Sequence, residues 1–207
     1  MKTILHVSCS PRGQSAESYR LSQMILGHLL QRDPQALVIE RAIGRDPIQP
    51  IDEAYATSQQ DSGDTSREGT MMKSEELVRE LEGADCVVIG TPMHNMTVPA
   101  SLKSWIDHVV RVRRTFEVTP AGKVGLLPDR PVFVAIASGG RFSGDRARQP
   151  DFLTPYLKAV MGMIGLLDVT FFSIQSTGSG QDAVAKARIR TGLELAGYFS
   201  SQPTDEG

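Results

Sequence analysis

Residues 3–18 read TILHVSCSPRGQSAES: an apolar run passes directly into a polar loop with serines and a glycine, and then into a helical pattern. Two further apolar runs end in polar loops, TPMHNM at residues 91–96 and SGGR at residues 138–141. In an open parallel sheet, ligands bind beyond the carboxyl ends of the strands, where the strand order reverses. The three loops therefore predict one composite binding pocket.

Five apolar runs, most of them nearly continuous and rich in Val and Ile, are typical of strands covered on both faces. They are Thr3–Ser8, Leu37–Arg41, Cys86–Thr91, Pro131–Ala137 and Val169–Ile174. Five amphipathic helical patterns lie between or after them. This alternation predicts an α/β class, with a doubly wound five-stranded parallel sheet of order 2-1-3-4-5 and helices on both faces. We expect residues 1–200 to form one domain and residues 201–207 a disordered tail.

Apolar positions at helical spacing predict which face of each helix is buried. The last three helical patterns align Leu102, Trp105, Ile106, Val109 and Val110; Phe152, Tyr156, Leu157, Val160, Met161 and Ile164; and Ala185, Ile189, Leu193, Ala196 and Phe199. The stripe around Trp105 suits either the core or an interface. Residues 42–72 and 113–130 lack periodicity, which predicts either functional lids and partner contacts or surface decoration.

Composition excludes several classes of function. The net charge is −2, from 22 basic and 24 acidic residues, which leaves no basic footprint for nucleic acid. No apolar stretch reaches the roughly 18 residues of a membrane span. Cys9 and Cys86 form neither a disulfide framework nor a metal-ligand spacing. We therefore expect a cytoplasmic protein with no metal site and no nucleic-acid or membrane partner.

The first loop suits a single phosphate group. It lacks both the dinucleotide fingerprint and the P-loop pattern, and the sixth residue after Cys9 is Ser15, not the Arg of a cysteine phosphatase. Hydroxyls at Ser10, Ser15 and Ser18 and the free N–H groups at the start of the next helix favour a bound phosphomonoester. The alternative is that Ser15 merely caps that helix.

Taken together, the three loops resemble the flavin-contacting loops of the FMN-dependent NADH-azoreductases, relatives of the NAD(P)H quinone dehydrogenases. The residues that carry the resemblance are Ser10, Ala16, Glu17 and Ser18; Pro92, Met93, His94, Asn95 and Met96; and Ser138, Gly139, Gly140 and Arg141. Pro99-x-x-Leu102-Lys103, Thr115-Phe116 and Pro155-Tyr156-Leu157-Lys158 extend it along nearly the whole chain. The chain departs from the family at His94 and Met96, where aromatics are usual, and at Arg141, which follows the glycines instead of preceding them.

The resemblance implies a flavodoxin-like fold, a homodimer and FMN as prosthetic group. It also implies ping-pong electron transfer from NADH or NADPH to quinones and aromatic azo compounds. By the same resemblance, Ser10 and residues 16–18 hold the phosphate, residues 93–96 follow the isoalloxazine, and residues 138–141 contact its far side. A glycine turn beside a cation there would stabilise negative charge near flavin N1.

The flavin N5 carries the chemistry in this hypothesis, so no catalytic side chain is expected. His94 is a candidate proton donor, or else a spacer exposed to solvent. Two other hypotheses remain open: a flavodoxin-type electron carrier without its own small-molecule turnover, and a flavin-free adaptor that has kept the fold. Arg111, Arg113 and Arg114 are a candidate site for the 2′-phosphate of NADPH.

Overall fold

The computed structural model describes residues 2–58 and 69–202. Its main sheet is parallel and has the order β2-β1-β3-β6-β7, which confirms the predicted 2-1-3-4-5 plan. The strands are β1 (Thr3–Ser8), β2 (Leu37–Arg41), β3 (Cys86–Pro92), β6 (Val132–Ala137) and β7 (Val169–Ile174). The five apolar runs predicted these bounds to within one residue because the inner strands are buried on both faces.

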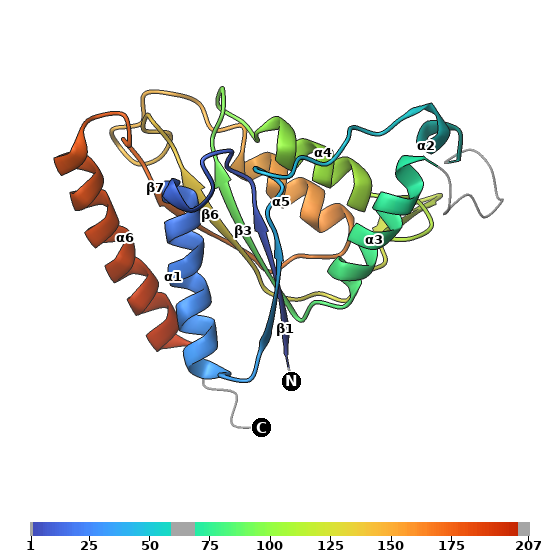
Figure 1. Cartoon of the computed structure of the whole chain (residues 1–207), viewed down its shortest axis with the longest axis horizontal. Helices are drawn as coiled ribbons and strands as arrows, with labels where there is room; N and C mark the ends of the chain where they lie inside the picture. The colour runs from blue at the N-terminus through green and yellow to red at the C-terminus, as the bar shows by residue number, and fades with distance from the viewer. Residues whose placement is uncertain (1, 59–68, 203–207) are drawn as a thin grey trace.

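Helices cover both faces of the sheet (Figure 1). One face carries α1 (Glu17–Arg32) and α6 (Gln181–Ser201); the other carries α3 (Thr70–Glu82), α4 (Ala100–Val109) and α5 (Thr154–Met163). A separate apolar cluster fills the space on each side of the sheet. Trp105 is fully buried in the larger cluster, and Val110 at the end of its stripe is only partly buried. Most of the stripe therefore belongs to the core of this chain, and its Val110 end stays open to an interface.

The predicted faces of the last two helices were partly wrong. Ile189 and Leu193 on α6 are 66% and 70% exposed, and the buried positions are Ala187, Thr191, Leu195 and Phe199. Phe152 precedes α5 and is exposed. On α6, two apolar stripes with the same helical spacing compete, and only the direction from which the sheet approaches decides which stripe is buried.

Both irregular segments contain structure that the sequence patterns did not indicate. A short hairpin pairs β4 (Phe116–Thr119) with β5 (Gly122–Gly125). The described part of 42–72 includes α2 (Glu53–Ser58), where the Tyr55 hydroxyl donates to the carbonyl of Asp107 at 2.9 Å. This segment therefore packs on the side of α4. Residues 59–68 of the segment and 203–207 of the expected tail lie outside the described residues, and Ser201 still belongs to α6.

Candidate functional site

A cleft of about 970 Å³ lies beyond the carboxyl ends of β1, β3 and β6 and beside the first turns of α1 and α6. Four loops contribute to it, one after each of β1, β3, β6 and β7. The lining residues are Ser10, Pro11, Arg12, Ala16, Glu17, Ser18, Pro92, Met93, His94, Ala137, Gly139, Thr177, Gly178, Gly180, Gln181, Asp182, Val184, Ala185 and Arg188. The structure thus brings the three predicted loops together in one cavity, where a parallel sheet is expected to bind its ligand.

The first loop is held in place by its backbone. The amide of Cys9 donates to the Gly90 carbonyl at 2.8 Å, and the Ser101 hydroxyl donates to the Cys9 carbonyl at 2.9 Å. Gly44 packs directly beneath the loop: a Cβ there would lie 2.2 Å from the Ser10 carbonyl oxygen. Only glycine allows two backbones to approach this closely, so residue 44 fixes the path of residues 9–10.

The start of α1 presents unused donors to the cleft. Its N-cap is Ala16, which has no side chain able to accept from the first-turn N–H groups. Ser18 is 1% exposed, lines the cleft, and its hydroxyl has no hydrogen-bond partner. A buried hydroxyl without a partner is costly, and at a helix N-terminus it fits an anionic oxygen. Because Ser10 and Ser18 flank this point, the donor set fits a phosphate ester.

Ser15 does not take part in this arrangement. Its hydroxyl donates to the Arg12 carbonyl at 2.8 Å, and it does not line the cleft. The prediction that its hydroxyl serves the phosphate is therefore not supported. The alternative, that Ser15 caps α1, was wrong because a short 3-10 turn, η1 (Gly13–Ser15), precedes the helix and makes Ala16 the N-cap. The same turn carries the Ser15 side chain away from the cavity.

In the second loop, only part of the predicted set reaches the cleft. Met93 and His94 line it, whereas Asn95 and Met96 form the tip of a tight turn closed by two backbone hydrogen bonds between His94 and Thr97, each of 3.0 Å. Asn95 has φ 48° and Met96 has φ 70°. This region is unusual for a Met, so the loop stores backbone strain at the mouth of the site.

The third loop places Gly139 at the cleft surface, where an added Cβ would meet nothing within 4 Å. Gly140 and Arg141 are not among the lining residues. A Cβ on Gly140 would collide with the Gln149 side chain, and the Arg141 Nε donates to the Ser176 hydroxyl at 3.1 Å. Arg141 therefore ties the third loop to the fourth, and its contact with a flavin stays a prediction.

Ser138 is buried behind the cleft surface. Its hydroxyl contacts the Met93 sulfur at 3.7 Å, and the Gln149 side-chain amide donates to the Ser138 hydroxyl at 3.2 Å and to the Met93 sulfur at 3.1 Å. These contacts fix the Met93 side chain, which forms part of the cleft wall. Ser138 thus supports the site from behind, and its contact with a flavin stays a prediction.

Sequence reasoning missed the fourth loop, residues 175–180, and the first turns of α6. The amides of Thr177 and Gly178 donate to the carbonyls of Ser138 and Gly139 at 3.0 and 3.2 Å, so this loop pairs with the third. The signal was present, because QSTGSG follows the apolar run 169–174 as a polar, glycine-bearing loop of the same kind as the other three. The helix α6, which follows this loop, brings Arg188 to the cavity.

Neither cysteine is suited to chemistry. Burial raises the pKa of the Cys9 thiol far above its usual range and that of Cys86 to about 12, so both stay protonated and unreactive. Within residues 2–58 and 69–202, no group of three or more His, Cys, Asp or Glu side chains could hold a metal ion. His94 is exposed and lines the cleft, so it is open to both a ligand and solvent.

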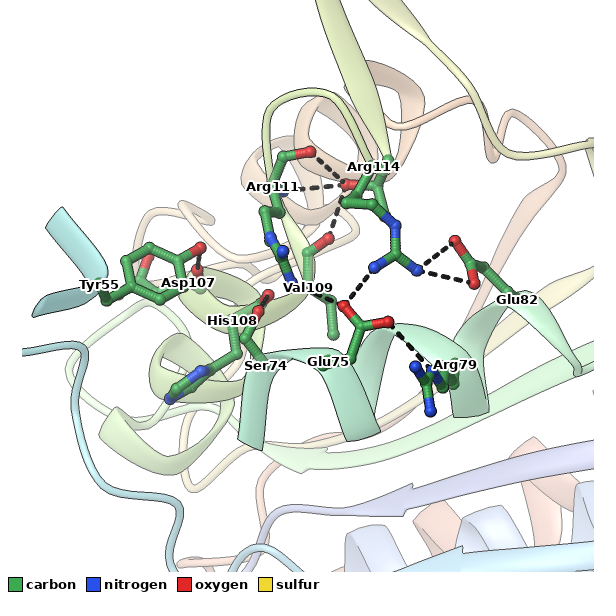
Figure 2. A network of polar contacts seen from close by, with 11 residues as sticks. Tyr55, Ser74, Glu75, Arg79, Glu82, Asp107, His108, Val109, Arg111 and Arg114 are labelled. Atoms are coloured by element: carbon green, nitrogen blue, oxygen red, sulfur yellow. Dashed lines mark hydrogen bonds and ion pairs between the residues drawn. The ribbon is translucent and has the colours of Figure 1, made fainter. Parts of the chain in front are cut away.

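Two members of the arginine cluster, Arg111 and Arg114, form ion pairs with α3, on the face of the sheet opposite α1 and α6 (Figures 1 and 2). Glu75 accepts from Arg79, Arg111 and Arg114, and Arg114 also binds both carboxylate oxygens of Glu82 at 3.1 Å. Neither Arg111 nor Arg114 lines the cleft. The structure therefore does not support a 2′-phosphate site at these residues.

Comparison with known proteins agrees with this geometry. A family model described as flavodoxin-like fold matches residues 2–194. The FMN-dependent NADH:quinone oxidoreductase 4 of Pseudomonas fluorescens is 43% identical over 203 residues, which cover 97% of this chain and 98% of that protein. The chain belongs to the FMN-dependent NADH:quinone oxidoreductase family. Another member, from Cupriavidus pinatubonensis, is 42% identical over 190 residues, covering 90% of this chain and 92% of its own length.

Solved structures show that this family member shares its fold with azoreductases. A crystal structure of an azoreductase from Bacillus anthracis gives a TM-score of 0.84 at 23% identity and covers 98% of this chain and 100% of that one. An FMN-dependent NADH-azoreductase of Bacillus anthracis, in complex with FMN, gives 0.78 at 22% identity, with 96% and 99% covered. The predicted flavodoxin-like fold is confirmed. No helix in the described part of this chain has the length and apolar character of a membrane span.

Proposed function

We propose that this chain is an FMN-dependent oxidoreductase that transfers electrons by a ping-pong mechanism from NADH or NADPH to quinones and aromatic azo compounds. The observation that carries the proposal is the buried, unpartnered hydroxyl of Ser18, a residue that lines a large cleft at the uncapped N-terminus of α1. The relatives named as FMN-dependent NADH:quinone oxidoreductases support it over nearly the whole chain length. Bound FMN would supply the redox chemistry, taking two electrons from a reduced nicotinamide and giving them to an electron-poor aromatic.

The chain itself contributes binding and orientation. Ser10, Ser18 and the first-turn amides of α1 would hold the phosphate, which anchors one end of the cofactor. Met93 presents an apolar wall, and Gly139 leaves open space beside the backbone, so a flat ring system fits between the second and third loops. Asn95, Met96, Gly140 and Arg141 lie outside the cleft lining. They would shape these loops, and their contact with the flavin stays a prediction.

One cleft serves both half-reactions in this proposal, which is why donor and acceptor would bind in turn. His94 is positioned to deliver a proton to a product at the cleft mouth, because it lines the cavity and is exposed. A flavodoxin-type electron carrier is the less favoured alternative. Such carriers dock through strongly acidic surfaces, and the net charge here is only −2.

Two measurements test the proposal. Heat release and chromatography of the flavin should yield FMN, and recovery of mainly FAD would contradict the cofactor assignment. Steady-state assays with NADH and NADPH against a panel of quinones and azo dyes should give parallel double-reciprocal lines. A protein that binds FMN but oxidises neither nucleotide in the presence of any acceptor would support the electron-carrier alternative instead.

We further propose that the active form is a homodimer. An apolar depression of about 410 Å³, lined by residues that include Ile51, Val110, Phe116 and Val160, lies apart from the cleft on the side of α4 and α5. Burying such a surface against a second copy would be favourable. Light scattering should show a dimer for the wild type and a monomer for Ile51→Glu. A fully active wild-type monomer at assay concentration would refute the dimer.

The remaining assignments also stay proposals. Residues 1–200 would act as one FMN-binding domain. A cytoplasmic location fits two cysteines that are buried and unpaired with each other. Fractionation of cells producing the tagged protein tests the location, and recovery in an oxidising compartment would contradict it.

A further inference from the structure

An ion pair joins the two helices that border the phosphate end of the cleft. The Arg188 guanidinium on α6 donates to both carboxylate oxygens of Glu17 on α1, from Nε at 2.7 Å and from a terminal nitrogen at 2.5 Å. The two helices run side by side on one face of the sheet (Figure 1). Bidentate pairs of this kind are specific in geometry, so Arg188 fixes where the Glu17 carboxylate lies.

Glu17 stands where an anion would bind. It is the first residue of α1, directly before Ser18, and its carboxylate is favoured there by the positive end of the helix. A phosphate dianion at Ser18 and the first-turn amides would compete with Glu17 for the same positive end and be repelled by its charge. The carboxylate is firmly ionised: hydrogen bonding from Arg188 holds the pKa of Glu17 below its usual value.

The charged side chains that line the cleft offer a phosphate no surplus of positive charge. Among the described lining residues, the charged side chains are Arg12, Glu17, Asp182 and Arg188. They balance formally, so the cavity offers a phosphate no net positive charge, and its attraction comes from hydroxyls and backbone amides. Loss of either arginine would leave a net negative cleft. Of the two arginines, Arg188 is the one that contacts Glu17 directly. The Arg188 side chain is 40% exposed and the Glu17 side chain is 13% exposed.

We propose that Arg188 is a positioning residue for cofactor binding: it neutralises Glu17 and holds that carboxylate aside, so that the N-terminus of α1 accepts the phosphate dianion. This inference rests on the proposed function, because it takes the FMN phosphate to bind at Ser18. Arg188 acts through Glu17 and not by contacting the phosphate. Flavin binding at one end of the cleft is thereby coupled to the docking of α6 against α1.

The test is a double-mutant cycle read as dissociation constants for FMN and for riboflavin, which lacks the phosphate. Arg188→Gln should weaken FMN binding about tenfold, because one uncompensated carboxylate then faces a doubly charged phosphate. Riboflavin binding should change less than about twofold. Glu17→Gln combined with Arg188→Gln should restore FMN binding to the level of Glu17→Gln alone, and Arg188→Lys should retain most of the affinity.

Arg190→Gln is the matched control, since Arg190 lies on the same helix and pairs with Glu194, outside the cleft lining. Equal losses for FMN and riboflavin would overturn the proposal, because they would indicate a structural role only. A double variant as weak as Arg188→Gln would also overturn it, by placing Arg188 on the phosphate itself. If the wild type binds neither flavin, the proposed function is refuted as well. If the wild type binds FMN and Arg188→Gln binds FMN no more weakly than Arg190→Gln does, this inference alone is refuted.

Discussion

Ser18→Ala should change the stability of the apoprotein and its affinity for FMN in opposite directions. The Ser18 hydroxyl is buried at 1% exposure and has no hydrogen-bond partner. An unsatisfied buried polar group costs about 1–3 kcal/mol. We therefore expect the variant to raise the free energy of unfolding of the apoprotein by about 1 kcal/mol, or about 2–4 °C in Tm for a chain of this size.

FMN binding should weaken in the same variant. A hydrogen bond to a charged group contributes about 1.5–3 kcal/mol, which corresponds to a loss of about tenfold to a hundredfold in affinity. Riboflavin affinity should stay close to that of the wild type. Calorimetry of the apoprotein and flavin fluorescence titration measure the two effects separately.

Ser22→Ala is the matched control, one turn further along α1. Ser22 is equally buried, but its hydroxyl donates to the Tyr19 carbonyl and contacts the His6 ring, both at 2.8 Å. Its removal should destabilise the protein by about 1 kcal/mol and leave the preference for FMN over riboflavin unchanged. The reasoning would be refuted if Ser18→Ala destabilised the apoprotein as Ser22→Ala does, or if it bound FMN as tightly as the wild type.

Three further predictions concern other parts of the molecule. Gly139→Val should leave the Tm of the apoprotein within about 2 °C but weaken flavin binding more than tenfold, because its Cβ points into open cleft; a variant with wild-type flavin affinity would place the ring elsewhere. Met96→Gly should stabilise the fold by up to about 1 kcal/mol in denaturant unfolding, because residue 96 has φ 70° and is 41% exposed; lower stability would show that the strain is compensated. Burial lowers the pKa of His6 from 6.5 to about 4, so the unfolded chain takes up the proton first. The free energy of unfolding should therefore fall by up to about 3 kcal/mol as pH drops from 6.5 through 4, and a His6→Gln variant that lost stability just as steeply would contradict this.

Much of the site could be predicted from sequence because its parts are local. A strand buried on both faces is a continuous apolar run, and the loop after it begins where the apolar run stops. The loops that carry Ser10, Ser18, Met93 and Gly139 were predicted in this way, and Met93 and Gly139 themselves were named from the family resemblance. The strand order then brought these loops to one edge of the sheet. The loop after β7 has the same pattern but was not predicted, and its residues line the cleft with the other three loops.

Only the tertiary structure decided which way side chains point and which residues distant in the chain come into contact. Ile189 and Leu193 have the spacing of a buried stripe that also includes Phe199, but α6 buries Thr191 and Leu195 together with Phe199. The orientation of a side chain within a loop is likewise set by what packs behind it, as with Arg141 on Ser176. Glu17 and Arg188 are 171 residues apart in the chain; no local pattern links them, because their pairing arises only when the two helices dock on the same face of the sheet.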